Sequence, residues 1–134
     1  MLKKTITYTD YDGNKRTEDF YFNINKAEMT RMQMSENGGY ANYIRKIINE
    51  NDSSKLYSIF EHIICLAYGE KSLDGKRFIK SEELTENFKQ TEAYSELIME
   101  LFNNSAVAAQ FFKGILPADV VEQIKDDDLK ELTK

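Results

Sequence analysis

The sequence has 134 residues, of which 18 are Lys or Arg and 23 are Asp or Glu, so its formal net charge is −5. This length suits a single domain, and its apolar runs are far shorter than the ~20 residues of a membrane-spanning helix, so we expect no membrane association. A single cysteine excludes an internal disulfide, and the N-terminus MLKKTITYTD lacks the apolar stretch of a secretory signal, so we predict a reducing compartment.

The first residues have the alternation of a β-hairpin. Apolar residues alternate with threonines at 5–9 and with polar residues at 20–24, and the segment DYDGNK at 10–15 between them is rich in turn formers. Because two strands alone are marginally stable, we expect their aromatic face to pack on the helices that follow.

At Asn25 the apolar period changes to that of a helix. Asn25 and Glu28 have the spacing of a capping box, which predicts a helix from Lys26 to about Ser35 that ends at Gly38-Gly39. A second helix is expected from about Tyr40 to Asn49, because its apolar residues recur on one stripe.

The clearest pattern in the chain predicts a helix at about 54–68. Its apolar residues recur at spacings of three and one, and we place them at the centre of the core: Leu56, Ile59, Phe60, Ile63, Ile64 and Ala67. Gly69 is expected to take the left-handed conformation that follows a helix end. The segment 69–81 contains the turn signal Asp74-Gly75, which predicts a tight loop or a miniature hairpin.

The later helices are predicted from their caps and breaks. Ser81 caps a fourth helix, and Thr91 caps a fifth that runs to about Phe102. A sixth helix runs to Lys113 and stops at Gly114, and it is expected to bury Val107, Ala108, Phe111 and Phe112. Pro117 fits the first turn of a last short helix.

These elements together predict a mainly α fold. An N-terminal β-hairpin at about 3–24 is followed by six or seven short helices at about 26–125, in a single compact domain that covers residues 1–125. The acidic residues 126–134 are expected to form a frayed, solvated tail.

The charge is unevenly spread along the chain. Residues 1–80 carry 13 basic and 11 acidic residues, whereas residues 81–134 carry 5 basic and 12 acidic ones. This asymmetry is compatible with head-to-tail self-association or with a basic partner, but acidic helix starts and a solvated tail explain it more simply.

Residues suited to catalysis or metal binding are scarce. His62 and Cys65 are spaced like two zinc ligands, but the chain has no other His or Cys, and the calcium-loop-like opening Asp10–Asn14 has Lys15 and Tyr21 at its sixth and twelfth positions. No nucleophile elbow, phosphate loop or dinucleotide motif is present. Paired carboxylates stay formally open, as in any acidic protein. We therefore predict no catalytic residue, no metal and no cofactor, and a protein that is not an enzyme.

A short basic segment has a superficial likeness to a nucleic-acid site. Lys71, Lys76, Arg77 and Lys80 surround Phe78, but the sequence pI is near 5.0, far below that of a typical nucleic-acid-binding domain. We expect these residues to solubilise an exposed loop, and nucleic acid is not an expected partner.

Apolar side chains are the main candidates for binding. The chain has 8 Phe, 8 Tyr and 5 Met, which suit contacts with a partner helix. Met29, Met32 and Met34 cannot all face inward from one short helix, and Phe111 and Phe112 point in different directions. Those left outside would form a patch suited to self-association or to a partner.

Several segments, taken in order, resemble the tail assembly chaperones of long-tailed bacteriophages and prophages. They are YGEKSLDGKRFIKSEEL at 68–84, the pattern F-x-QT-x-AYSELIMEL at 88–101, AAQFFKGILP at 108–117, and upstream FNINKAEMTRM at 22–32 with Gly38-Gly39. The resemblance covers about 95 residues, from about Phe22 to Pro117, and Leu73 and Ile98 depart mildly from it.

The resemblance implies a non-enzymatic assembly factor. Such proteins are encoded between the genes for the tail tube and tape-measure proteins, and many also have a longer form made by translational frameshifting. They coat the tape-measure protein in the host bacterial cytoplasm until tube subunits polymerise around it, and they are absent from the mature virion.

The expected partners are therefore the tape-measure protein, a second copy of the chain and, as a further candidate, the tail tube protein. We predict that the partner-binding surface contains Met29, Met32, Phe78, Phe111 and Phe112. Two other functions stay open: a helical DNA-binding regulator, in which a pair of short helices reads DNA, and a structural subunit of the virion tail.

Overall fold

The computed structural model describes residues 1–35, 39 and 53–115. The helix predicted at 40–49, the short helix after Pro117 and the acidic tail lie outside these residues, so they stay predictions. Within the described part, two strands are followed by two helices, two further strands and three further helices.

Two long antiparallel strands open the chain, β1 (Leu2–Thr9) and β2 (Lys15–Phe22). In the turn between them, the Gly13 N–H donates to the Asp10 carbonyl at 3.0 Å, and Gly13 has a φ of 86°. That left-handed conformation favours glycine, which explains the choice of residue at this turn. The hairpin is confirmed, but β2 both begins and ends earlier than the predicted 20–24. It ends at Phe22 because the N–H groups of the next two residues, Asn23 and Ile24, donate to the carbonyls of Ala67 and Ile115.

A second hairpin, formed by β3 (Tyr68–Lys71) and β4 (Phe78–Ile79), extends the first into one sheet. β3 pairs with β2 through Tyr21↔Gly69 and the neighbouring pair, so the strand order is β1-β2-β3-β4 with every pair antiparallel. Its loop is closed by a hydrogen bond from the Gly75 N–H to the Ser72 carbonyl, 3.0 Å long.

The prediction of a mainly α fold with six or seven short helices is wrong. The part of the chain that the structure describes contains a four-stranded antiparallel sheet and five helices, so the fold is α+β. The turn signal at 74–75 predicts the second hairpin correctly, but nothing in the local sequence indicates that its first strand pairs with β2. Gly69 does not take the predicted left-handed conformation, because the chain enters β3 at Tyr68, directly after the helix, and Gly69 lies in that strand.

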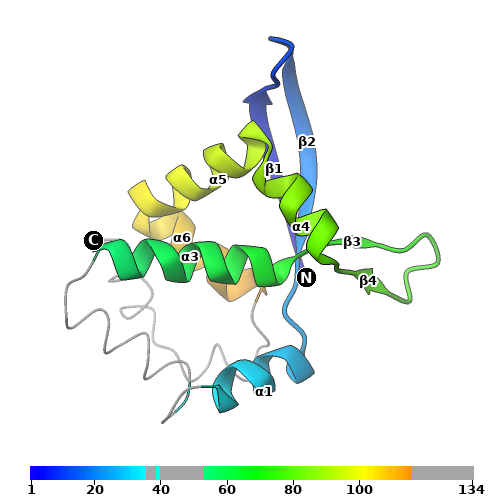
Figure 1. Cartoon of the computed structure of the whole chain (residues 1–134), viewed down its shortest axis with the longest axis vertical. Coiled ribbons are helices and arrows are strands. Elements are labelled where there is room, and N and C mark those ends of the chain that lie inside the picture. The colour runs from blue at the N-terminus through cyan, green and yellow to red at the C-terminus, as the bar shows by residue number, and fades with distance from the viewer. Residues whose placement is uncertain (36–38, 40–52, 116–134) are drawn as a thin grey trace.

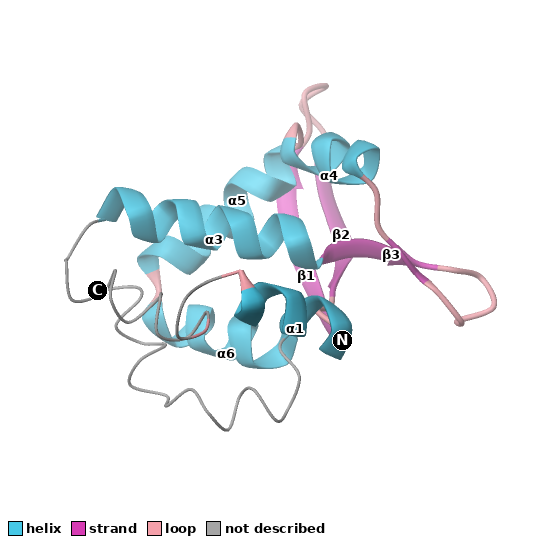
Figure 2. Cartoon of the chain, turned by 60° about the horizontal axis from the view of Figure 1, so that its bottom comes forward, coloured by secondary structure: helices cyan, strands magenta, loops and turns pink. Residues whose placement is uncertain are grey.

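The described residues also contain five helices. They are α1 (Lys26–Met34), α3 (Ser53–Ala67), α4 (Glu82–Lys89), α5 (Glu92–Asn103) and α6 (Ser105–Ile115). Figure 1 and Figure 2 show α3, α5 and α6 gathered on one side of the β1–β2 hairpin, while the β3–β4 hairpin projects on the other side.

The predicted helix starts are confirmed by their caps. The Glu28 N–H donates to the Asn25 side-chain oxygen at 2.8 Å, and the Glu28 carboxylate accepts from the Asn25 N–H at 3.1 Å, so the capping box is complete. The side-chain oxygens of Ser81 and Thr91 accept backbone N–H groups at the starts of α4 and α5.

The predicted stop of the sixth helix at Gly114 is wrong, because α6 continues to Ile115. A Cβ at position 114 would lie 2.9 Å from Cδ1 of Leu2 in β1. Gly114 therefore permits the close approach of α6 to the first strand, and its presence does not signal a helix end.

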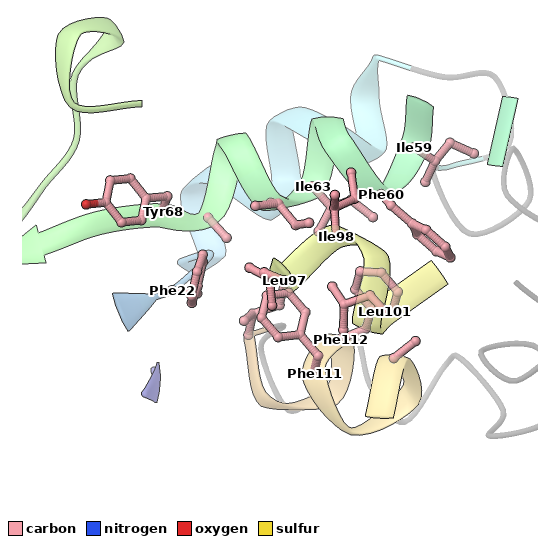
Figure 3. Close-up of a cluster of buried hydrophobic side chains, with 14 of the residues drawn as sticks. Phe22, Ile59, Phe60, Ile63, Tyr68, Leu97, Ile98, Leu101, Phe111 and Phe112 are labelled. Carbon is pink, nitrogen blue, oxygen red and sulfur yellow. The ribbon is translucent and has the colours of Figure 1, made fainter. Parts of the chain in front are cut away.

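The core lies between the helices and the sheet. All six residues of the predicted α3 stripe are buried, as are most of the apolar residues of α5 and α6. Phe22, at the end of β2, is fully buried, with its ring centroid 5.1 Å from that of Phe111 and 6.0 Å from that of Phe88. Figure 3 shows Phe22, Leu97, Phe111 and Phe112 converging below α3.

Gly69 is the position where the junction of β2, β3 and β4 is tightest. A Cβ there would lie 2.7 Å from the Ile79 carbonyl oxygen, a backbone atom of the neighbouring strand. We expect Gly69→Ala to lower the free energy of unfolding by about 1–3 kcal/mol, measured by urea denaturation.

Gly75→Asn in the same hairpin is the control for this substitution. No atom lies within 4 Å of a Cβ built at Gly75, and asparagine tolerates its φ of 74°. We expect the control to cost less than about 1 kcal/mol. Equal stability of Gly69→Ala and the unmodified protein would show that the junction has room for a side chain.

Candidate functional site

A pocket of about 580 Å³ opens between α1, the C-terminal half of α3 and β4. Its apolar lining comes from Ala27, Met32, Leu66 and Phe78, and its charged lining includes Glu28, Arg31 and Lys80. A volume of this size is typical of sites that bind a small ligand or several side chains of a partner. It is the candidate binding site in the described residues.

Lys80 joins two walls of this pocket, α1 and β4. Its Nζ donates to the Asn23 carbonyl at 2.6 Å and to both Glu28 carboxylate oxygens, at 2.8 Å and 2.7 Å. Nζ also lies 5.7 Å from the ring centroid of Phe78. Since Glu28 belongs to the capping box, this ion pair attaches the start of α1 to the residue that follows β4.

The rim of the pocket differs from its interior. Ala27, Arg31 and His62 are exposed, whereas Met32 is buried and Leu66 and Phe78 are half-buried. The Lys80 charge is matched by Glu28, and Arg31 adds a positive charge at the opening. Chemically, the pocket can cover an apolar side chain while its rim contacts polar groups beside it.

Four of the five residues predicted to bind a partner lie in the core. Met29, Met32, Phe111 and Phe112 are 4%, 6%, 3% and 1% exposed. The expectation that the three methionines of α1 cannot all face inward is confirmed, since Met34 is exposed, whereas neither phenylalanine is left outside. Phe78 and Met32 both line the pocket, and Phe78 is the more accessible of the two because it is half-buried. A direct role of these five residues in partner binding stays a prediction.

The physical reason is that both phenylalanines of α6 find aromatic partners inside. The Phe112 ring centroid lies 5.3 Å from that of Phe60 in α3, and the Phe111 ring contacts Phe22. In α1 the exposed methionine is Met34, at 79% exposure, because a helix turns by about 100° per residue and so places Met34 on the other side from Met32.

Sequence reasoning missed two features of the pocket. Leu66 lies at the edge of the buried α3 stripe and is partly buried, and an extra apolar residue beside such a stripe is a signal that points to a site of this kind. Lys80 does not solubilise a loop as expected; it points into the pocket, and no local pattern predicts its pairing with Glu28, 52 residues earlier. Lys71, Lys76 and Arg77 are exposed, as expected.

His62 and Cys65 are not part of a metal site that the described residues reveal. His62 is exposed, Cys65 is partly buried, and no group of three or more His, Cys, Asp or Glu in the described part is arranged to hold a metal ion. Burial raises the pKa of the Cys65 thiol. Burial also raises the pKa of Tyr94, whose hydroxyl donates to the Glu61 carboxylate at 3.0 Å.

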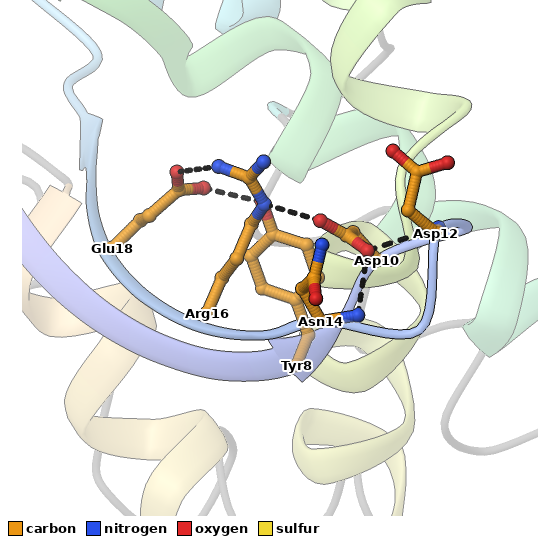
Figure 4. A network of polar contacts seen from close by, with 6 residues as sticks. All are labelled: Tyr8, Asp10, Asp12, Asn14, Arg16 and Glu18. Atoms are coloured by element: carbon orange, nitrogen blue, oxygen red, sulfur yellow. Dashed lines mark hydrogen bonds and ion pairs between the residues drawn. The ribbon is translucent and has the colours of Figure 1, made fainter.

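The hairpin turn that superficially matches a calcium loop is stabilised by its own side chains (Figure 4). One Asp10 carboxylate oxygen accepts the N–H groups of Asp12 and Asn14, both at 2.9 Å, and the other lies 2.6 Å from Arg16. These contacts, with the Arg16 guanidinium first, hold the pKa of Asp10 below its usual value. The Asp10 carboxylate thus serves the turn and its ion pair.

Comparison with known proteins identifies the family. A sequence profile described as phage tail assembly chaperone matches residues 1–133. No curated protein and no solved structure matches the chain significantly. Among the described helices, none is long and apolar enough to cross a membrane.

The placement of Phe112 generates a stability prediction. Because its side chain is buried against Phe60, Phe112→Asp places a carboxylate in the core, and we expect it to cost more than about 3–5 kcal/mol and to unfold the domain. Circular dichroism during thermal unfolding measures this loss. Met34→Asp, at an exposed position, is the control and should change stability by less than about 0.5 kcal/mol. A folded Phe112→Asp protein would contradict the core placement.

Proposed function

Because the chain belongs to the phage tail assembly chaperone family, we propose that it binds the tape-measure protein and keeps it soluble until the tail tube polymerises around it. The family match over residues 1–133 is the observation that carries this proposal. The proposed action is non-enzymatic: the chaperone covers apolar surface of its partner and releases it when tube subunits take its place.

The pocket between α1, α3 and β4 supplies a surface with the required chemistry. A long helical partner exposes apolar stripes that would aggregate if they were left uncovered. An apolar side chain from such a helix fits between Leu66 and Phe78, while neighbouring polar groups reach the rim at Arg31. One such contact is weak, which suits a chaperone that must let its partner go.

Self-association completes the proposed mechanism. Several copies along one tape-measure chain raise the effective concentration of each contact, so weak sites together give strong coverage. In this proposal the chaperone works in the host bacterial cytoplasm, meets the tail tube protein as its competitor for the tape-measure chain, and is absent from the mature virion.

The alternative functions have distinct signatures. A DNA-binding regulator would bind duplex DNA with an affinity that falls steeply with salt, whereas we expect no such binding from this chaperone. A structural tail subunit would be found in purified particles. The family match favours the chaperone over both.

Co-purification tests the proposed partner and its site. The substitution Ala27→Glu places a carboxylate at the exposed mouth of the pocket, at the second residue of α1, where helix formation tolerates it. We expect it to reduce co-purification of the tape-measure protein after co-expression by about tenfold or more.

Ala106→Glu provides a closely matched control. Ala106 is also exposed and is also the second residue of its helix, α6, which lies away from the pocket lining. Retention of the tape-measure protein by Ala27→Glu, at the level of this control, would show that the pocket is not the site. Failure of the unmodified chain to retain it would reject the proposed partner.

A further inference from the structure

The outer edge of β2 has an unpaired stretch. β1 pairs with β2 along its whole length, but β3 pairs with it only at Tyr21 and Phe22 before turning away to β4. Within the described residues, the edge from Lys15 to Phe20 has no neighbouring strand on that side. An open edge of this length is a template for another strand.

The hydrogen-bonding pattern identifies which residues face outward. The Asn23 N–H donates to the Ala67 carbonyl on the β3 side, and backbone groups alternate between the two edges of a strand. The odd-numbered residues of β2 therefore point their N–H and C=O groups away from β1. On the open stretch these are Lys15, Thr17 and Asp19.

The charges on this edge are self-complementary. The strand reads KRTED from Lys15 to Asp19, so an antiparallel copy centred on Thr17 places each Lys15 opposite the other copy's Asp19. The same register places Arg16 opposite the second copy's Glu18, and Thr17 opposite Thr17. Charged edges usually prevent pairing, but opposite charges at directly facing positions favour it.

A second feature lies at the end of the open edge. Where β3 leaves β2, a cavity of about 430 Å³ is lined by the carboxylates of Glu18, Asp19 and Glu70, with Lys71 as its basic residue. In the antiparallel register, the second copy's strand enters this fork with its Lys15 end. The net negative lining therefore meets an incoming lysine.

We infer that β2 pairs with β2 of a second copy across a twofold axis at Thr17, joining the two sheets into one. Each copy contributes the same five residues, as an isologous interface requires. The inference rests on the self-association proposed above and names its surface, but it is independent of the tape-measure protein. Because the interface is small, we expect a dissociation constant between about 1 µM and 1 mM.

The outer edge of β1 lacks this complementarity. Its outward-facing residues are Lys3, Thr5, Thr7 and Thr9, which include no acidic residue. Two copies paired through β1 would therefore gain no ion pair, and the equivalent position in β1 serves as a control.

Proline substitution tests the edge directly. The Thr17 N–H points to the open edge, so Thr17→Pro removes an outward donor without removing a bond to β1. Thr7→Pro, at the residue paired with Thr17, makes the same change on β1. In sedimentation velocity between about 10 µM and 1 mM, we expect the unmodified chain and Thr7→Pro to dimerise, and Thr17→Pro to weaken the dimer at least about tenfold.

A charge exchange tests the antiparallel register centred on Thr17. It introduces no proline, so its outcome does not depend on whether β2 tolerates one. Lys15→Glu and Asp19→Lys each place like charges opposite each other in a homodimer, so each variant alone should be monomeric. In a mixed dimer, the glutamate introduced in one copy faces the lysine introduced in the other. The unchanged Asp19 of the first copy likewise faces the unchanged Lys15 of the second. Both facing positions then carry opposite charges again, and the mixture should dimerise.

Three results would overturn the inference. They are a monomeric unmodified chain throughout this range, a folded Thr17→Pro protein that dimerises like the unmodified chain, and a mixture of the charge variants that stays monomeric. Dimerisation that resists Thr17→Pro would leave self-association standing but reject this edge. Sedimentation measures these results in the absence of the tape-measure protein, whose retention is tested separately by Ala27→Glu at a different surface.

Discussion

The end of β2 is the constraint on which the other elements depend. Phe22 is fully buried among aromatic rings from β3, α4 and α6, so the strand cannot shift by one residue without exposing it. Directly beyond it, the Asn23 N–H bonds the Ala67 carbonyl at the end of α3, and the Ile24 N–H bonds the Ile115 carbonyl at the end of α6, at 2.8 Å and 3.0 Å. Three elements distant in sequence are thereby joined at one point.

The two proposed surfaces follow from this junction. The Asn23 carbonyl accepts Lys80, whose pairing with Glu28 holds the start of α1 against the β3–β4 hairpin and so forms the pocket. Earlier along the same edge of the strand, β3 pairs with only the last residues of β2 before it turns to β4, so among the described residues the earlier part of β2 has no neighbour on that side. The end of β2 thus helps to form both the apolar pocket and the exposed edge, which are two separate surfaces.

Local features of the fold were predictable where neighbouring residues cause them. The capping box at Asn25, the caps at Ser81 and Thr91, and the α3 stripe all depend on residues within a few positions of one another, and the structure confirms them. The burial of Phe111 and Phe112 was predicted from the apolar period of their helix, and it is confirmed. The rings that they meet, Phe22 and Phe60, belong to other elements and were not predictable in this way. Of the predicted binding residues, Phe78 and Met32 lie in the lining of the pocket.

The amino-acid order alone was enough to establish the family and the helix and hairpin boundaries to within a few residues, since caps, turns and apolar periods act over short distances. Only the folded chain shows that β3 joins β2 and turns a helical prediction into an α+β fold. It alone shows that Lys80 serves a pocket and not a solvated loop, and that Gly69 and Gly114 permit close contacts. In each case the partner lies on another element of the fold, and no local pattern encodes which surface a residue will meet.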